Sequence, residues 1–471
     1  MVFSSLVFTC IFLPVVLILH SVVRNRKVQN GLLLAASLLF YTYGEPVYIL
    51  LMLVSTLLNY LFALLLGKWR SKLILALAVF VNLGLLGVFK YTGFVLTNVN
   101  DFFGLAIPVP AISLPIGISF FTFQALSYVI DVYRDEVAVQ KSYPKLLLYV
   151  SFFPQLIAGP IVRYKDVALE IDDRTVSVRN IAFGLRRFIV GLGKKVLIAN
   201  AMGAAADYVF NHGAANINIL AAWIGAIAYL MQIYYDFSGY SDMAIGLGKA
   251  FGFHFKENFN HPYIADTVQE FWRRWHISLS SFFRDYVYIP LGGNRKGKFR
   301  TVLNRIIVFF LTGLWHGANW TFILWGMFHG FLLLLETFIP LIKKLPKLLR
   351  HIYTLLAVTV AFVVFRADTI SEAFLYIAQM FSGFDFSPAA MSFAIQGLSP
   401  YFVAMLLAAI LCCGPLRKLS AGVSNLENKP SLTVVQHIIQ GMSFVLAFVL
   451  FAWCIVRLAG GSYNPFIYFR F

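Results

Sequence analysis

Histidines in apolar surroundings are the residues of this sequence best suited to proton transfer. His316 lies in the middle of residues 306–325, a stretch apolar enough for a membrane helix, and Asn319 follows one helical turn later on the same face. An imidazole titrates near physiological pH, so it takes up or releases a proton readily. An ionisable group at membrane depth is costly and usually faces a bundle interior or a water-filled cavity. His316 is therefore either a catalytic base or a neutral histidine that shares a hydrogen bond with a neighbouring helix.

A second histidine, His276, lies in the aromatic and amphipathic segment of residues 271–293. This segment is too charged for a simple membrane span. It predicts an interfacial or re-entrant helix, with tryptophans at headgroup depth and Arg273 and Arg274 towards water. Without further information, an incidental histidine in an interfacial helix explains His276 better than a catalytic role.

A compact basic loop, residues 294–300, follows this segment and contains Arg295, Lys296 and Lys298. Basic loops beside apolar spans are typical of the cytoplasmic side of a membrane protein. Contact with anionic lipid headgroups is the common explanation for such a loop. An anionic cofactor or substrate is the alternative ligand.

The composition establishes the class of protein that holds these residues. Hydrophobic residues make up 60% and charged residues 13%, and the mean hydropathy is +0.77. Soluble domains average roughly 45–50% apolar and about 25% charged residues. The apolar runs do not alternate with polar residues, as β-barrel strands do. We therefore predict an all-α polytopic membrane protein with roughly 11–13 membrane helices, re-entrant segments included.

The net charge of +17 does not indicate nucleic-acid binding, because the basic residues form short clusters between apolar runs. The cluster at residues 24–27 places the N-terminus outside the cytoplasm, and counting crossings places the C-terminus outside as well. Residues 163–195 are expected to form a cytoplasmic loop and a surface helix, before spans at about 196–210 and 219–237.

Every loop is too short to fold alone, which predicts a single membrane domain. We divide it into N-terminal helices (residues 1–110), a core with both histidines (111–340), C-terminal helices (341–459) and an aromatic tail (460–471).

No metal site is predicted, because the four cysteines and the acidic residues lack ligand spacing. Asp236 and Asp242 lie six residues apart beside an apolar run, and such positions are not neighbours on a helix. A structural role, as a cap or as the partner of an arginine, is the better interpretation.

Several long strings of this sequence resemble the membrane-bound O-acyltransferase family, and its bacterial alginate O-acetyltransferase branch in particular. They are Trp-Arg-Arg-Trp-His-Ile-Ser (272–278), Phe-Arg-Asp-Tyr-Val-Tyr-Ile-Pro-Leu-Gly-Gly (283–293) and Leu-Thr-Gly-Leu-Trp-His-Gly-Ala-Asn-Trp-Thr (311–321). Two further strings, residues 235–242 and 258–263, also look like that branch.

The resemblance implies an arched helical core with a central pore that is open to an acyl donor from the cytoplasm and to an acceptor from outside. It implies that His316 is the family's central histidine and that His276 occupies its second polar position. It also implies acetyl-CoA as the donor substrate, an extracytoplasmic partner protein and a polysaccharide acceptor, at the bacterial plasma membrane.

The chain's ending, Phe-Ile-Tyr-Phe-Arg-Phe (466–471), resembles the C-terminal motif of the small protein that accompanies the teichoic acid D-alanyl transferase of the same family. In that system a tyrosine is proposed to carry the acyl group, and its equivalent here is Tyr468. The alternative is an aromatic tail that anchors at the membrane interface.

The resulting hypothesis assigns His316 as general base, with Asn319 or His276 orienting its ring or donating to the oxyanion. Basic residues would hold the nucleotide part of the donor: Arg273, Arg274, Arg295, Lys296 and Lys298. Three alternatives stay open. They are a transporter or flippase of a lipid-linked precursor, a D-alanyl transferase, and a eukaryote-like lipid or protein acyltransferase.

Overall fold

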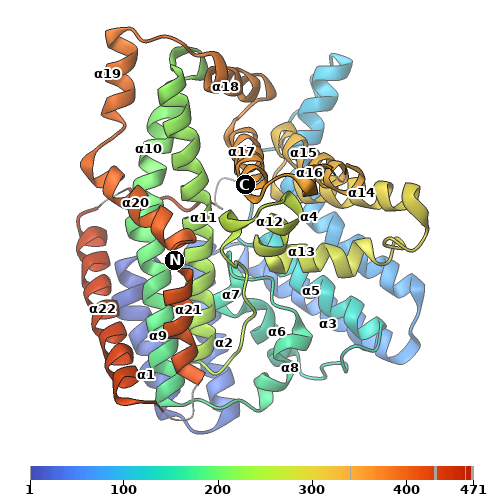
Figure 1. Cartoon of the computed structure of the whole chain (residues 1–471). Coiled ribbons are helices and arrows are strands. Elements are labelled where there is room, and N and C mark those ends of the chain that lie inside the picture. Colours follow the sequence, from blue (N-terminus) through green and yellow to red (C-terminus); the bar gives the residue numbers. More distant parts are fainter. Residues whose placement is uncertain (1, 340, 429–431, 462, 468–471) are drawn as a thin grey trace. The chain divides into compact units, whose positions relative to one another are not determined.

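The computed structural model describes residues 2–339, 341–428, 432–461 and 463–467, which form helices and loops without a β-strand (Figure 1). Two compact units divide the chain. The first comprises Met1–Phe188 with Ser241–Lys256, and the second comprises Ile189–Tyr240 with Glu257–Phe471. The predicted all-α class is confirmed.

Seven helices within the described ranges are long and apolar enough to cross a membrane. They are α3 (Ile49–Trp69), α4 (Lys72–Phe103), the continuous run Val178–Phe210, α11 (Ile219–Ala250), α15 (Trp320–Phe338), α17 (Lys347–Arg366) and α22 (Val434–Ala459). The pair α19 (Pro388–Gln396) and α20 (Pro400–Cys413), bent by 62°, would make an eighth span. The chain is a multi-pass membrane protein. The predicted total of 11–13 membrane helices is a wider count, because it also included re-entrant segments.

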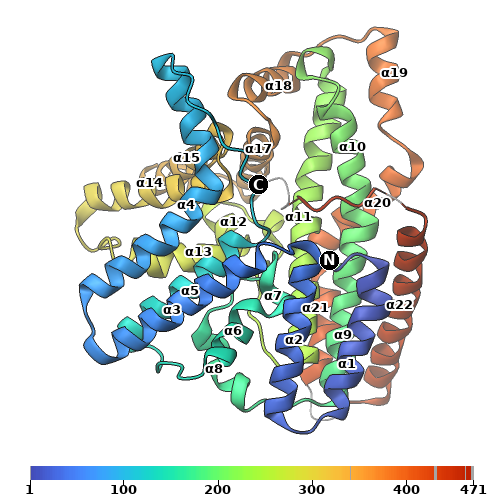
Figure 2. The same ribbon diagram turned by 180° about the vertical axis from the view of Figure 1, so that it is seen from behind.

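In the first unit, α5 (Ile118–Tyr133) packs against α3 and α4 (Figure 2). Asn59 of α3 and Asn82 of α4 exchange two side-chain hydrogen bonds, of 3.0 and 2.8 Å. This amide pair joins two apolar helices where no bulk water would solvate either side chain. The unit's other helices are α1 (Leu13–Val22), α2 (Arg26–Gly44), α6 (Tyr143–Ser151), α7 (Phe153–Leu156) and α8 (Tyr164–Asp172).

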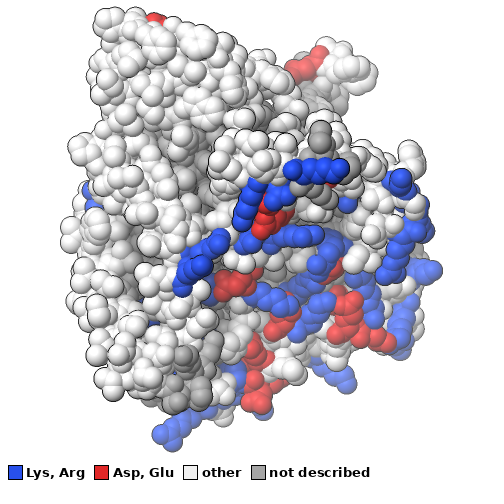
Figure 3. All heavy atoms as spheres, in the orientation of Figure 1, with Lys and Arg blue, Asp and Glu red and all other residues white. Residues whose placement is uncertain are grey.

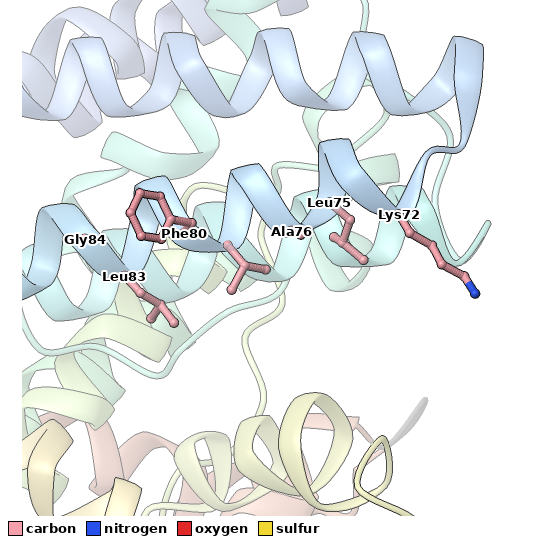
Figure 4. Close-up of a pocket in the computed structure, with 7 residues that line it drawn as sticks. Lys72, Leu75, Ala76, Phe80, Leu83 and Gly84 are labelled. Carbon is pink, nitrogen blue, oxygen red and sulfur yellow. The ribbon is translucent and has the colours of Figure 1, made fainter.

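A surface hollow on the first unit is lined by residues of α4 alone (Figure 4): Lys72, Leu75, Ala76, Val79, Phe80, Leu83 and Gly84. Most of this lining is aliphatic or aromatic, and Phe80 is 73% exposed. An exposed apolar face on a membrane helix fits contact with lipid. The hollow offers no histidine, serine or carboxylate for acyl transfer.

In the second unit, α14 (Gly297–His316) and α15 lie side by side in both views (Figures 1 and 2). α15 also contacts α17 and the short α12 (Val268–Arg274). The remaining helices of this unit are α10 (Asn200–Phe210), α13 (Ile277–Phe283), α16 (Leu341–Lys344), α18 (Ile370–Ser382) and α21 (Arg417–Asn425).

The expectation of a cytoplasmic loop and a surface helix over residues 163–195 is wrong in its second half. α9 (Val178–Gly193) continues through the π-helical turn η2 (Lys194–Ala199) into α10 as one apolar run. Its basic residues do not end the run, because acidic residues of α11 pair with two of them. Arg187 bonds Asp242 at 2.8 Å, as expected of a structural arginine pair, and Lys195 bonds Asp236 at 2.8 Å.

The expectation of one helix through residues 306–325 is also wrong. α14 ends at His316, Gly317 is extended, and α15 begins at Trp320. Asn319 is the N-cap of α15, and its Oδ1 accepts the Thr321 N–H at 3.0 Å. Asparagine competes for backbone groups in this way and favours helix starts. Asn319 is therefore not on a shared helical face with His316.

Glycines allow α14 and α15 to approach closely around this turn. A Cβ on Gly313 would lie 2.5 Å from the Phe322 carbonyl oxygen, and one on Gly326 would meet the Phe309 carbonyl oxygen. Both obstacles are backbone atoms, which cannot rotate away as a side chain can. Small residues at helix contacts are the usual means of tight packing in membranes.

We predict that Gly326→Ala forces the two helices apart and destabilises the protein by about 1–3 kcal/mol, as overpacked cores do. The measurement is the midpoint of thermal unfolding in detergent. Gly441→Ala on α22 is the matched control, because a Cβ there meets nothing within 4 Å. Equal midpoints for the two variants would contradict the packing argument.

Candidate active site

His316 occupies the C-terminal end of α14 and is only 6% exposed. Its ring makes edge contacts with Trp325 of α15, at 4.9 Å between centroids, and with Phe365 of α17, at 5.2 Å. Its sequence neighbour Trp315 lies at 5.0 Å. Three helices thus enclose this imidazole in aromatic side chains, a poorly hydrated setting in which electrostatic interactions are strong.

Trp315 contacts both histidines that the sequence singled out. Its ring centroid is 5.7 Å from that of His276 and 5.0 Å from that of His316. The structure therefore brings His276 and His316 into one aromatic-lined region of the second unit. Interpreting His276 as an incidental interfacial residue does not fit this placement, because its side chain is fully buried.

His276 stands between α12 and α13 with a left-handed backbone, φ 43°. This conformation is uncommon for a residue other than glycine, and such outliers concentrate at functional sites. The ring's Nδ1 lies 3.2 Å from the amide oxygen of Asn258. Because an amide oxygen only accepts, Nδ1 carries the proton and Nε2 is left with a lone pair. Burial lowers the pKa of His276 to about 3, which keeps the ring neutral.

Asn258 fixes the backbone around His276 as well as its ring. The Asn258 side-chain oxygen also accepts the Ser278 N–H at 3.1 Å and the Ser278 hydroxyl at 2.9 Å. Its carbonyl oxygen accepts the Ile277 N–H at 2.9 Å. Since the Ser278 hydroxyl donates to Asn258, its proton does not point at the imidazole. This arrangement does not suit a serine nucleophile activated by His276.

A third histidine, His329 of α15, belongs to the same region and was missed in the sequence. It is fully buried, and its ring centroid lies 5.1 Å from that of Trp325 and 5.2 Å from that of Trp272. Trp325 therefore contacts both His329 and His316. The signal was present in the sequence, because His329 is an ionisable residue within an apolar span.

The start of α12 is fixed by polar contacts with α15 and α17. The buried Glu336 carboxylate of α15 accepts the backbone N–H groups of Val268, at 2.6 Å, and Gln269, at 3.0 Å. Arg350 of α17 bonds Asp266 at 2.5 Å. A carboxylate at a helix N-terminus satisfies donors that lack a partner within the helix.

The other predicted site residues have more varied surroundings. Asn319 donates from Nδ2 to the Asp368 carbonyl oxygen at 2.9 Å while its oxygen caps α15, so both polar ends hold backbone groups. Arg274 pairs with Glu270 at 2.7 Å and Arg273 is exposed. Arg295 and Lys296, which precede α14, and Lys298, which lies in its first turn, are also exposed, so the predicted basic loop ends where α14 begins at Gly297.

The charges on the visible face are unevenly spread (Figure 3). Broad areas carry no charged side chain, as is typical of lipid-facing surfaces, and Lys and Arg side chains gather elsewhere among a few acidic ones.

Tyr468, the predicted acyl carrier, lies outside the described residues. Among the residues that are described, no group of three His, Cys, Asp or Glu is placed to hold a metal ion.

Comparison with known proteins identifies the family. The profile of the membrane-bound O-acyltransferase family matches residues 116–379, which is more than half of the chain and contains all three histidines of the site. The chain is 40% identical over 492 residues to the probable alginate O-acetylase of Pseudomonas putida, and the match covers 100% of both proteins.

Two further relatives carry other names. A peptidoglycan O-acetyltransferase of Helicobacter pylori is 38% identical over 79% of this chain and 78% of that protein. A teichoic acid D-alanyltransferase of Bacillus subtilis is 29% identical over 52% of this chain and 65% of that protein. The chain belongs to the membrane-bound O-acyltransferase family and is a multi-pass membrane O-acyltransferase.

Proposed function

We propose that this enzyme takes an acetyl group from cytoplasmic acetyl-CoA and delivers it for O-acetylation of a cell-surface or secreted polysaccharide. The observation that carries the proposal is the buried pair His276 and His316, joined by Trp315, within the region that matches the acyltransferase family. The names of the relatives, an alginate O-acetylase and a peptidoglycan O-acetyltransferase, support acetyl as the group and a polysaccharide as the acceptor.

The proposed reaction is attack of a hydroxyl group on the acetyl thioester. His316 accepts the hydroxyl proton as the new O–C bond forms, and the C–S bond then breaks. The departing thiolate takes up the proton, which leaves the enzyme unchanged. Burial keeps the His276 ring neutral, and the hydrogen bond from its Nδ1 to Asn258 fixes the direction in which Nε2 points. Aromatic walls limit the access of water and so limit thioester hydrolysis.

Exposed basic residues of the second unit suit the nucleotide end of the donor. Arg273, together with Arg295, Lys296 and Lys298 at the start of α14, offers cationic groups to phosphates. Arg274 is less available, because it already pairs with Glu270. This assignment places the basic loop on the cytoplasmic side of the bacterial plasma membrane, with both termini outside.

We further propose that Tyr468 is the first acceptor of the acetyl group and passes it to an extracytoplasmic esterase-like partner. A phenol has an unperturbed pKa of about 10 and needs a base such as His316 for attack.

Likeness to a D-alanyltransferase favours an alternative function in which carrier-bound D-alanine is the donor. The alternative outside the enzymes is a transporter or flippase, which would move a lipid-linked precursor across the membrane without a chemical reaction.

We predict that His316→Ala folds and inserts but slows acetyl transfer by ~10²–10⁴-fold, the usual contribution of a general base. The measurement is release of CoA from acetyl-CoA by purified protein, together with acetylation of the polymer in cells. His437→Ala, at an exposed histidine of α22, is the control and should keep full activity. Normal polymer acetylation by His316→Ala would refute the mechanism.

A second prediction concerns Tyr468. After incubation with isotopically labelled acetyl-CoA, mass spectrometry of the C-terminal peptide should find the label on Tyr468. The label should be absent in Tyr468→Phe and in His316→Ala. CoA release that depends on His316 without any label on Tyr468 would instead mean direct transfer to an external acceptor.

Asn258→Ala tests the orientation of His276. The change leaves the buried Nδ1 proton and the Ser278 N–H without their acceptor, which we expect to destabilise the protein by about 1–3 kcal/mol. Acetyl transfer should fall as well. Ser278→Ala keeps the bond between Asn258 and the imidazole, so smaller losses are expected. Equal losses in thermal stability and transfer for the two variants would count against this role of Asn258.

A further inference from the structure

The segment that leads to the C-terminus, residues 463–467, packs against α10, η2 and α11 of the second unit. Tyr463 donates its hydroxyl hydrogen to Asp207, and the Asn200 amide donates to the Asn464 side-chain oxygen at 3.1 Å. Lys195 Nζ donates to the Pro465 carbonyl oxygen. Successive residues of the tail contact helix residues of decreasing number, so the tail runs antiparallel to α10.

The contacts end at the buried ion pair between Lys195 and Asp236, whose side chains are 3% and 1% exposed. The Ile467 backbone N–H donates to Asp236 Oδ2 at 2.8 Å. The Phe466 ring contacts the Tyr240 ring in a tilted arrangement, at 4.9 Å between centroids, and Phe466 is 7% exposed. The end of the described tail, Phe466 and Ile467, is thus enclosed by the unit, whereas Tyr463 is 40% exposed.

The ion pair lies near the middle of two candidate membrane spans. Lys195 is the eighteenth of 33 residues in the run Val178–Phe210, and Asp236 is the eighteenth of 32 in α11. The tail therefore reaches the central level of these helices. Lys195 itself lies in the π-helical turn η2, an irregularity that is frequent at functional sites.

Stability alone does not account for these two charges. A buried ion pair suffers a desolvation penalty, and well-packed apolar residues in its place are often as stable or more stable. Here the cation meets a backbone carbonyl group and the anion meets a backbone N–H group of the tail. Hydrogen bonds to charged groups are stronger than those between neutral groups. The ion pair therefore binds backbone groups of the tail, and this binding does not depend on the identity of the tail's side chains.

We propose that Lys195 and Asp236 are positioning residues that fix the depth and register of the C-terminal tail in the helix bundle. Pro465 and Ile467 are held two residues apart, so the pair fixes the last described residues of the tail at this level of the bundle. The consequence for acetyl transfer rests on the proposed function, because Tyr468 is the next residue in the sequence.

The test compares hydrogen exchange of intact protein in lipid nanodiscs with that of the double variant Lys195→Met/Asp236→Leu. Replacing both charges together avoids leaving one buried ion without its partner, which a single change would do. We expect exchange of the Ile467 amide to become faster by about tenfold or more, because its bond to a carboxylate is lost. Amides inside α10 and α11 should keep their protection.

The matched control is Arg187→Met/Asp242→Leu, which removes the ion pair between α9 and α11 in the first unit. It should leave exchange of the tail unchanged. A second variant, Phe466→Ala, acts from the tail side and keeps both charges, and it should also speed exchange at Ile467. Unchanged tail protection in Phe466→Ala and in the double variant, or equal release in the control, would overturn the proposal.

Transfer of labelled acetyl, measured on the same variants, separates this inference from the proposed function. A released tail with no label on the C-terminal peptide and impaired polymer acetylation is the expected result. A released tail with unchanged polymer acetylation would leave the ion pair as the tail's anchor and would refute the Tyr468 relay. A protected tail with lost acetylation would refute the anchor while leaving the chemistry at His316 intact.

Discussion

The close approach of α14 and α15 is the constraint on which the histidine site depends. Gly313 and Gly326 leave room for opposing backbone carbonyl groups, and a side chain at either position would push the helices apart. Because the helices meet so closely, the turn after His316 is short and directs its ring towards Trp325 and Phe365. A glycine pair between α14 and α15 thus decides where this imidazole lies.

A second constraint is that polar groups in apolar surroundings must find partners within the protein. The structure meets it with contacts between distant segments, such as the amide pair of Asn59 and Asn82 and the capping of α12 by Glu336. Asn258 serves His276 in the same way. Since each contact fixes a loop or a helix end, the groups that satisfy hydrogen bonds also hold the site in place.

The surroundings of the histidines suit chemistry on a thioester. The thioester donor proposed above is already activated, so the proposed reaction needs a base, an oriented acceptor and protection from water. His316 is enclosed by aromatic rings, and the burial of His276 keeps that imidazole neutral. The buried pair of Lys195 and Asp236 extends the same principle to the tail, because charge placed in a dry interior gives strong and directional hydrogen bonds.

The sequence by itself determined the membrane class, most of the apolar helices and the family resemblance, and it singled out His276 and His316 as candidate site residues. Hydropathy and long motifs are local properties, so they can be read without a fold. Tertiary structure decided that Asn319 caps α15, that Lys195 lies inside a continuous helical run, and that His329 joins the aromatic region. These outcomes depend on partners such as Asp236 that are distant in the chain, and the pattern of hydrophobic residues does not specify which distant side chains will meet.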